Sequence, residues 1–270
     1  MSILTMSTLG GNGRLGNQMF QYAALLGLAS TWNMKVALCR KSRLGDVFSL
    51  TENRTGNAGF VLVREHPNDC CVYRETILNQ ELSRHSVDLF GYFQTDKYWK
   101  HISSTICSTF RFKDQSIDSQ AKLLVDSVRA NGLPIVALCV RRTDYLATSV
   151  HALDPAWYDI AMNTMRQRIG LANYIMISDD PDWCSEYFPR RFNGFGNFVS
   201  ARNSDLIELS IIKQTDHIII ANSTFHWWGA WLNQNPSKLV VVPGKWFGRG
   251  GPTRWEDIYC DGWIVPDRNQ

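Results

Sequence analysis

The chain has 270 residues, of which 44% are hydrophobic and 20% are charged. This length and composition exclude a short peptide, a fibrous repeat and a disordered tail, and they suit one large domain or two smaller ones. Lysine and arginine total 28 against 25 acidic residues, a formal net charge of +3 without a long run of one sign. A nucleic acid is therefore not expected as a partner.

No segment of the sequence is expected to span a membrane. The most apolar stretches, near 134–140, 216–221 and 238–243, are far shorter than the roughly 20 residues that a membrane helix needs. The N-terminal residues lack the basic and apolar regions of a signal peptide. Seven cysteines without a C-x-x-C pair favour thiols in a reducing compartment, so we expect a cytoplasmic protein. The Golgi lumen is the alternative if an N-terminal anchor is missing from this sequence.

In the first half of the chain, helical spacing of apolar residues predicts a helix from about 14 to 31, followed by a short strand at 35–39. Residues 41–86 mix polar residues with brief apolar runs and predict irregular structure with one or two strands. A strand is expected at 87–93, then a helix from 96 towards 110 and a second helix over about 116–131.

Beyond Gly132 the pattern becomes regular. It predicts strands at 134–140, 173–177, 197–199, 217–221 and 239–242, and helices at 154–169, 180–187, 204–214 and 224–232. Strands alternating with helices imply parallel pairing, hence a doubly wound α/β domain whose ligands lie beyond the carboxyl ends of the strands. We expect a domain boundary near 132, which separates residues 1–132 from 133–270.

The first segment with chemical potential is the glycine-rich stretch Gly10–Gln18. Its glycines permit close approach to the backbone, and the following helix offers unpaired N–H groups, an arrangement that suits a phosphate. The stretch lacks the Lys-Ser/Thr ending of a P-loop. It has the spacing of a dinucleotide fingerprint, but the strand before it is weak and no acidic residue follows at the required distance. A flexible cap on the helix is the alternative.

The second segment is Cys139-Val-Arg-Arg-Thr-Asp-Tyr145, at the end of the most apolar strand. Because side chains alternate along a strand, one of Arg141 and Arg142 can meet a diphosphate while the other pairs internally. Three nearby residues could serve as a general base for an acceptor hydroxyl: Asp144, His151 and Asp154. For Asp144 we favour a different role, as an internal partner of Arg142.

The third segment, Ser178-Asp-Asp-Pro-Asp182, joins a strand to a helix. Asp180 is expected to cap the helix with Pro181 at its first position, which leaves Asp179 available for a ligand. Asp180-Pro-Asp182 also has the D-x-D form of a metal site that could hold the diphosphate of a nucleotide sugar. The rival interpretation is therefore a metal-dependent glycosyltransferase that uses another nucleotide sugar. We expect no metal, because capping explains Asp180 and the two arginines already supply positive charge.

The fourth segment, Ala221–Trp231, again joins a strand to a helix. Ser223 and Thr224 place hydroxyl groups at the helix N-terminus, and three tryptophans follow, most of which we expect in the core.

Together these segments resemble the α-1,2-fucosyltransferase family. The residues that carry the resemblance are Gly13-Arg-Leu-Gly-Asn-Gln-Met-Phe-Gln-Tyr-Ala23, Cys139–Tyr145, Ser178-Asp-Asp180 and Ile220-Ala-Asn-Ser-Thr-Phe-His-Trp-Trp-Gly-Ala-Trp-Leu232, in the order that the family has. The resemblance implies an α/β, GT-B-like fold of two Rossmann-like domains with the donor site in the cleft between them. It also implies inverting transfer of L-fucose from GDP-β-L-fucose to the 2-hydroxyl of a galactose-terminated glycan, giving an α-1,2 linkage, with neither a cofactor nor a metal.

The resemblance also assigns roles to residues. Arg141 is expected to stabilise the β-phosphate as a catalytic residue, with Asp144 as a second catalytic candidate. Arg142 would brace the strand end or the pyrophosphate. The C-terminal domain would hold GDP-fucose, and the N-terminal domain would contribute the acceptor side. The remaining donor-binding candidates are Asp179 at the guanine, Asn222, Ser223, Thr224 and Phe225 at the phosphate or fucose, and Gly13, Arg14, Gly16 and Asn17 over the pyrophosphate and sugar.

The chain departs from the family at Cys139, where the family usually has histidine near the nucleotide base. This departure leaves a catalytically inactive glycan- or nucleotide-binding relative as a further alternative.

Overall fold

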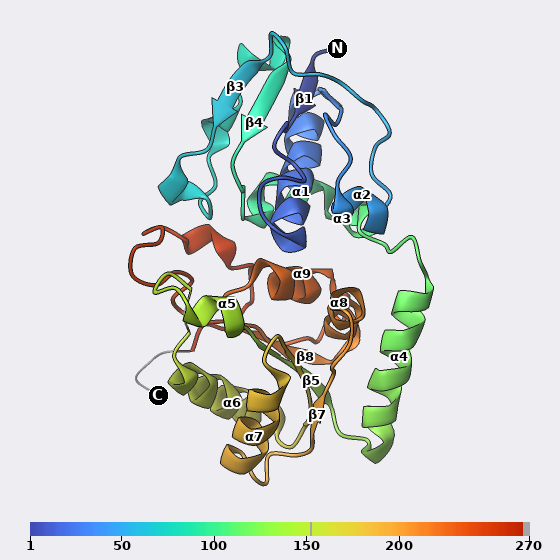
Figure 1. Ribbon diagram of the computed structural model, residues 1–270, viewed down its shortest axis with the longest axis vertical. Coiled ribbons are helices and arrows are strands. Elements are labelled where there is room, and N and C mark those ends of the chain that lie inside the picture. The colour runs from blue at the N-terminus through green and yellow to red at the C-terminus, as the bar shows by residue number, and fades with distance from the viewer. Residues whose placement is uncertain (152, 267–270) are drawn as a thin grey trace. The chain divides into compact units, whose positions relative to one another are not determined.

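The computed structural model describes residues 1–151 and 153–266, which form two compact units, each built on a parallel sheet (Figure 1). The first unit comprises Met1–Asp114 together with Pro252–Cys260, and the second comprises Gln115–Gly251 and the residues from Asp261 onward. The division thus falls before the expected boundary near 132, and a later segment returns to the first unit.

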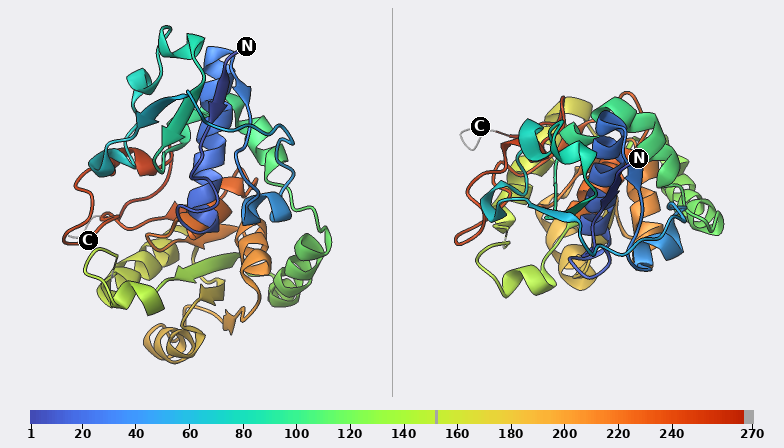
Figure 2. Two further views of the ribbon diagram at one scale, coloured as in Figure 1. Left: turned by 45° about the horizontal axis from the view of Figure 1, so that its top comes forward. Right: turned by 90° about the horizontal axis from the view of Figure 1, so that it is seen from above.

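Helix α4 (Ser116–Val128) accounts for the earlier division. It lies alongside α8 (Asp205–Gln214) in each view (Figures 1 and 2). The Lys213 ammonium lies 3.2 Å from the Asp118 carboxylate, and the Gln214 amide donates to the Asp118 carbonyl oxygen at 3.0 Å. These contacts make α4 part of the second unit.

The sheet of the first unit has four parallel strands in the order β2-β1-β4-β3. The strands are β1 (Ile3–Thr5), β2 (Lys35–Val36), β3 (Val61–Arg64) and β4 (Val87–Phe90). Helix α1 (Leu15–Trp32) confirms the helix expected at 14–31. The strand expected at 35–39 keeps only two residues, because its pairing with β1 ends at Val36.

The rest of the first unit is less regular, as the mixed composition of 41–86 predicts. It contains α2 (Arg43–Val47) and α3 (Ser103–Thr109), and 3-10 turns at Pro67–Asp69, Glu75–Ile77, Leu82–Arg84, Asp96–Tyr98 and Lys100–Ile102. The helix expected from 96 is therefore two 3-10 turns followed by α3. Its start packs against α1 at Gly27, where a Cβ atom would lie 2.1 Å from the Tyr98 carbonyl oxygen.

The second unit confirms the expected doubly wound arrangement. Its five strands are parallel in the order β7-β6-β5-β8-β9. They are β5 (Ile135–Val140), β6 (Asn173–Ser178), β7 (Phe198–Ser200), β8 (His217–Ile219) and β9 (Val240–Val241). Successive strands extend from β5 in one direction and then, from β8, in the other, so the carboxyl end of β5 lies where ligands of such sheets bind.

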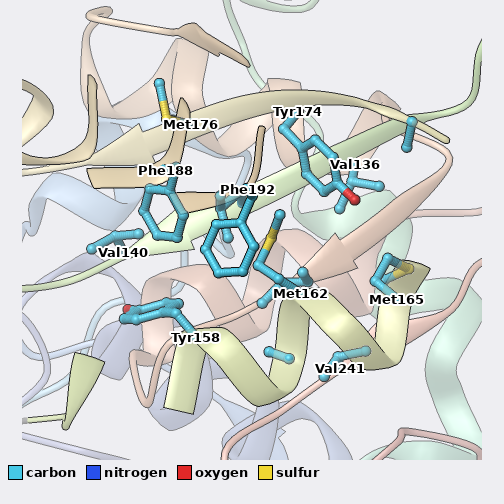
Figure 3. Packing of buried hydrophobic residues seen from close by; sticks show 14 of the residues in the cluster. Val136, Val140, Tyr158, Met162, Met165, Tyr174, Met176, Phe188, Phe192 and Val241 are labelled. Carbon is cyan, nitrogen blue, oxygen red and sulfur yellow. The ribbon is translucent and has the colours of Figure 1, made fainter. Parts of the chain in front are cut away.

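Helices cover both faces of this sheet (Figure 1). Besides α4 and α8, they are α5 (Thr143–Leu146), α6 (Pro155–Ile169), α7 (Pro181–Arg191) and α9 (Thr224–Leu232). A 3-10 turn at Arg129–Asn131 follows α4, whereas the turn at Glu256–Ile258 lies in the segment that returns to the first unit. Figure 3 shows the core on one face, where Val136 and Val140 of β5 meet Tyr158 and Met162 of α6 and Phe188 of α7. The intervening β5 residues face α8 and α9.

None of the helices in the described parts of the chain has both the length and the apolar character needed to cross a bilayer.

Candidate active site

The second unit gathers charged side chains at the carboxyl ends of β5 and β6. Arg141 and Arg142 follow β5 and leave it towards opposite faces of the sheet, as the alternation predicts. Arg142 turns towards α7, where its Nε lies 3.0 Å from Asp180 Oδ2 and its guanidinium carbon lies 3.8 Å from the centre of the Trp183 ring. Its positive charge is thus held within the unit by a carboxylate and an aromatic ring.

Arg141 turns towards the face that α8 and α9 cover. Its Nη2 lies 2.7 Å from Asp144 Oδ1, and its Nε lies 3.2 Å from Asp179 Oδ2. The expectation that Asp144 pairs with Arg142 is therefore wrong. Asp144 stands in the first turn of α5, one helical turn after Arg141, so its carboxylate meets Arg141 rather than Arg142.

The expectation that Asp179 is left without an internal partner is also wrong. Its Oδ1 accepts the Arg142 backbone N–H at 2.9 Å, and its Oδ2 accepts the Thr143 N–H at 3.2 Å and the Thr143 hydroxyl. These bonds tie the end of β6 to the start of α5. Asp179 thereby fixes the position from which Arg141 extends, and its contact with guanine stays a prediction.

The other carboxylates of the Asp180-Pro-Asp182 sequence are also paired. Asp180 caps α7 through the Trp183 N–H, with Pro181 at the start of the helix, as expected. Asp182 forms an ion pair with Arg202. Both acidic residues of the D-x-D pattern therefore have an arginine partner. The described residues contain no group of three or more His, Cys, Asp or Glu side chains placed to hold a metal ion.

The start of α9 brings the fourth segment to the same end of the sheet. Asn222 is only 4% exposed, and its side-chain nitrogen donates to the carbonyl oxygens of His151 at 3.0 Å and Trp246 at 2.9 Å. Ser223 is the N-cap residue but makes no side-chain cap, and Thr224 and Phe225 begin the helix half-buried. Asn222 is thus a structural anchor for the loop that presents the N-terminus of α9.

Helices α1 and α9 share an unusual N-terminus. Among the described helices of eight residues or more, these two alone have neither a side-chain cap nor an acidic residue in the first turn. The first N–H groups of a helix have no intrahelical partner, and the helix dipole makes this end positive. The glycine-rich sequence before α1 predicts phosphate binding, and the family resemblance implies phosphate or fucose binding at the start of α9.

Two residues with strongly shifted pKa values, His226 and Glu208, were not predicted from the sequence. His226, in the first turn of α9, is 4% exposed, and burial together with the Arg141 charge lowers its pKa to about 3. Glu208 of α8 has its pKa raised to about 7, mainly by burial and further by Asp205 and Asp179. The helical spacing of apolar residues in α8 and α9 could have indicated that both side chains lie on a partly or fully buried side of their helices.

Glu208 also raises the pKa of the Cys139 thiol, whose main cause is complete burial. Cys139 and Arg141 are two residues apart and so share a face of the strand. Two neutral groups, the Cys139 thiol and the His226 imidazole, therefore lie near Arg141.

Of the three candidate bases, His151 is the one whose side chain is not held in an ion pair or a helix cap. Asp144 pairs with Arg141, and Asp154 caps α6 by accepting the Ala156 N–H at 2.9 Å. The His151 ring stacks on Tyr145 with 4.8 Å between ring centres, and neither ring nitrogen has a hydrogen-bond partner within the described ranges. Burial lowers the pKa of His151, so the ring is neutral at pH 7 and can accept a proton.

The glycine-rich loop of the first unit is shaped by close contact with α1. Gly13 has φ of +84°, and a Cβ atom there would lie 2.5 Å from Asn17 Nδ2, so only glycine fits. Arg14 is the N-cap residue of α1, and Gly16 lies buried in its first turn. Asn17 Oδ1 accepts a hydrogen bond from Gln94 at 3.0 Å.

Comparison with known proteins identifies the family. The sequence pattern described as glycosyl transferase family 11 matches residues 2–266. The chain belongs to this family. As a family 11 glycosyltransferase it is an enzyme, and the resemblance inferred from its sequence motifs is confirmed.

Similar proteins include two whose names give an α-1,2 linkage and one that is named for O-antigen biosynthesis. An α-1,2-colitosyltransferase of Escherichia coli is 26% identical over 92% of this chain and 94% of its own length. The O-antigen biosynthesis glycosyltransferase WbnK of Escherichia coli is 25% identical, with 94% and 98% covered. A galactoside α-(1,2)-fucosyltransferase 2 of Rattus norvegicus is 27% identical over 84% of this chain and 67% of its own length.

Solved structures of fucosyltransferases share the fold. POFUT1 in complex with GDP-fucose gives a TM-score of 0.54 at 15% identity, over 89% of this chain and 98% of that chain. The α-1,6-fucosyltransferase NodZ soaked with GDP-fucose gives 0.51 at 14% identity, over 86% and 93%. The expected α/β, GT-B-like fold class of this glycosyltransferase is confirmed.

Proposed function

We propose that this glycosyltransferase moves L-fucose from GDP-β-L-fucose to the 2-hydroxyl of a galactose-terminated glycan, giving an α-1,2 linkage. The α-1,2 specificity in the names of the bacterial and rat relatives supports the linkage, and the rat relative supports galactose and fucose. GDP-fucose in the titles of the structures that share the fold supports the donor.

The observation that carries the proposal is the pairing of Arg141 with the uncapped N-terminus of α9 at one end of the second sheet. Arg141 is a fixed guanidinium whose position two carboxylates hold, and α9 presents backbone N–H groups from Thr224 and Phe225. This arrangement suits the oxygen atoms of a diphosphate. In the first unit, the loop that begins at Gly13 leads into α1, whose N-terminus also has neither a side-chain cap nor an acidic residue.

The reaction is an inverting displacement. The oxygen of the acceptor 2-hydroxyl bonds to C1 of fucose while the bond from C1 to the β-phosphate oxygen breaks, and its electron pair stays on GDP. Negative charge therefore grows on the β-phosphate as GDP departs. Arg141 and the helix N–H groups are preorganised to stabilise that charge, which is the main contribution of such donors to rate.

The proton of the acceptor hydroxyl needs a destination, and we assign it to His151. Its ring is neutral at pH 7, half-buried, and oriented by Tyr145 and Phe247 rather than by a hydrogen bond. Asp144 then acts through Arg141, by holding the guanidinium at 2.7 Å. The proposed reaction uses no cofactor and no metal, because the carboxylates that could bind an ion already pair with arginines.

A second donor deserves a test, because the E. coli colitosyltransferase is similar over nearly its full length. Colitose is fucose without the 3-hydroxyl group, so the two donors differ by one hydroxyl. An enzyme whose site hydrogen-bonds a substrate hydroxyl rejects the analogue that lacks it by large factors. We expect GDP-fucose to be preferred.

The test is a donor screen with galactose-terminated glycans, with and without EDTA, in which GDP or UDP release and the mass added to the glycan are measured. GDP-fucose should be the best donor in the presence of EDTA. Preference for GDP-colitose would change the donor, and loss of transfer in EDTA would replace the proposal with the metal-dependent alternative. GDP binding without transfer to any glycan would support an inactive relative.

A further inference from the structure

A chain of hydrogen bonds in the first unit leads from two adjacent cysteines to the glycine-rich loop. The sulfur atoms of Cys70 and Cys71 are 3.7 Å apart, and both side chains are buried. The Cys71 thiol donates to Gln94 Oε1 at 3.2 Å. Gln94 Nε2 then donates to Asn17 Oδ1 at 3.0 Å. In both hydrogen bonds the donor is the residue farther from Asn17: Cys71 donates to Gln94, and Gln94 donates to Asn17.

The chain decides which end of the Asn17 amide points outward. Because Gln94 fills the oxygen of Asn17, the nitrogen of Asn17 remains to bind something else, and it has no protein acceptor among the described residues. Gln94 in turn offers its nitrogen to Asn17 because its own oxygen is taken by the thiol. Buried amides whose two ends have unlike partners adopt one orientation.

Cys71 is suited to this role because it stays protonated. Its side chain is fully buried, and burial, Cys70 and Glu65 raise the pKa of its thiol. A thiolate could only accept a hydrogen bond, whereas the neutral thiol can donate to Gln94. The main chain also fixes Gln94, since its N–H donates to the Cys70 carbonyl oxygen at 2.6 Å.

The surroundings of Asn17 indicate what its nitrogen binds. Asn17 is in the first turn of α1, whose N-terminus has neither a side-chain cap nor an acidic residue. Gly13 lies directly against Asn17 Nδ2 and brings the loop backbone to the same point. An amide nitrogen at the positive end of a helix dipole, with no acidic side chain beside it, suits an oxygen-rich anionic ligand.

We propose that Cys71 and Gln94 are positioning residues, which turn the Asn17 side-chain nitrogen towards an oxygen atom of the nucleotide-sugar donor. This inference rests on the proposed function for the identity of the donor. The hydrogen-bond chain itself depends only on contacts within the first unit.

Three substitutions within the hydrogen-bond chain test the proposal by their effects on the KM of the nucleotide-sugar donor and on the Kd of GDP. Cys71→Ala removes the donor to Gln94 and should raise the donor KM about tenfold, the effect of one lost hydrogen bond to a charged ligand. Cys71→Ser keeps an O–H donor and should stay within about threefold of wild type. Gln94→Glu cannot donate to Asn17 and should raise the donor KM at least as much as Cys71→Ala.

A double substitution separates positioning from a general structural role. In an Asn17→Ala background, Cys71→Ala should change the donor KM by less than about twofold, because its effect passes through Asn17. Cys107→Ala, which removes a thiol of the same unit outside the chain, should leave the donor KM unchanged. Melting temperatures of all variants show whether any loss comes from unfolding.

Two results would show that the hydrogen-bond chain does not position Asn17. Equal donor KM for folded Cys71→Ser and Cys71→Ala, or a full tenfold effect of Cys71→Ala on top of Asn17→Ala, would overturn the proposal. If wild type uses a nucleotide sugar other than GDP-fucose, the proposed function fails, and the same ratios are measured with that donor. Absence of both turnover and nucleotide binding in wild type would overturn both proposals.

Discussion

Arg141 and Arg142 are neighbours in the chain, yet their surroundings give them different work. The Arg142 guanidinium lies over the Trp183 ring and pairs with Asp180, so its charge is stabilised by partners within the unit. Arg141 has carboxylates on two of its nitrogens, and its charge acts on His226 in the first turn of α9, a helix whose N-terminus has no side-chain cap. Arg141 is therefore the residue that we place at the departing diphosphate.

Replacement of Arg141 should affect turnover more than binding. Arg141→Ala is expected to lower kcat by about 10²–10³, the typical effect of deleting one transition-state charge stabiliser. The Kd of GDP should rise by less, because binding reports only ground-state contacts. Arg141→Lys should restore activity only in part, since an ammonium lacks the planar fork of the guanidinium. Steady-state kinetics and calorimetry with GDP provide the two numbers.

Arg142→Ala is the contrasting substitution. It leaves Asp180 without its partner and removes the cation from the Trp183 ring, so the melting temperature should fall, by a few degrees for a loss of about 1–3 kcal/mol. Near-normal turnover in folded Arg141→Ala together with abolished turnover in folded Arg142→Ala would show that the two roles are reversed.

Glu208 makes stability depend on pH. Burial raises its pKa to about 7 in the folded chain, whereas the unfolded carboxyl has its ordinary value near 4.5. As pH rises from 4.5 to 7, the unfolded chain releases this proton first, so the stability contributed by the protonated group is lost across that window. At pH 8, Glu208→Gln should therefore raise the free energy of unfolding above that of wild type by on the order of 1–2 kcal/mol. Its melting temperature at pH 8 should be higher accordingly.

The same substitution should have little effect near pH 4.5, where the carboxyl is protonated in the folded chain and Gln resembles it. Melting curves of wild type and Glu208→Gln at both pH values give the comparison. A stabilisation that is equal at pH 4.5 and pH 8 would show that the charge of Glu208 is not its cause.

At the scale of elements, the regular half of the chain could be predicted and the irregular half could not. Each strand of the second unit is an apolar run followed by a helical period, and such periodicity depends on burial alone. Residues 41–86 are instead ordered by contacts of individual side chains, for example the Glu65 carboxylate with the N–H groups of Tyr92 and Phe93. Contacts between residues so distant in sequence leave no local pattern.

The site was predictable to the same depth. Strand ends and helix starts identified the segments around Arg141, Asp179 and Asn222, because topology brings these positions together. The partner of each arginine could not be predicted. Arg141 and Arg142 point to opposite sides, and the backbone conformation after β5 decides which of them Asp144 reaches. His226 was missed because a buried histidine among tryptophans has the pattern of a core residue.

The N-terminus of α9 permits a matched comparison with α8. Both helices follow a serine that makes no side-chain cap, Ser223 before α9 and Ser204 before α8. Ser223→Asp adds a carboxylate where we place the diphosphate, so the donor KM should rise more than tenfold through charge repulsion. Ser204→Asp should leave the donor KM unchanged. Equal kinetics for folded Ser223→Asp and wild type would remove α9 from the donor site.

At the scale of the whole molecule, the cysteines bear on the compartment. No disulfide bond forms among the described residues, which include all seven cysteines. We therefore expect seven reactive thiols when the protein is denatured without a reductant. A thiol count with a chromogenic reagent measures this directly, and two or more protected pairs would contradict it.

For the whole molecule, we propose an inverting and metal-independent transfer of fucose to the 2-hydroxyl of galactose. The most direct measurement is the NMR spectrum of the glycan formed from GDP-β-L-fucose and a galactose-terminated acceptor in the presence of EDTA. We predict a single new α-linked fucose on O2 of the galactose. A β linkage, substitution at another hydroxyl, or a product that forms only when a divalent metal is restored would contradict the account.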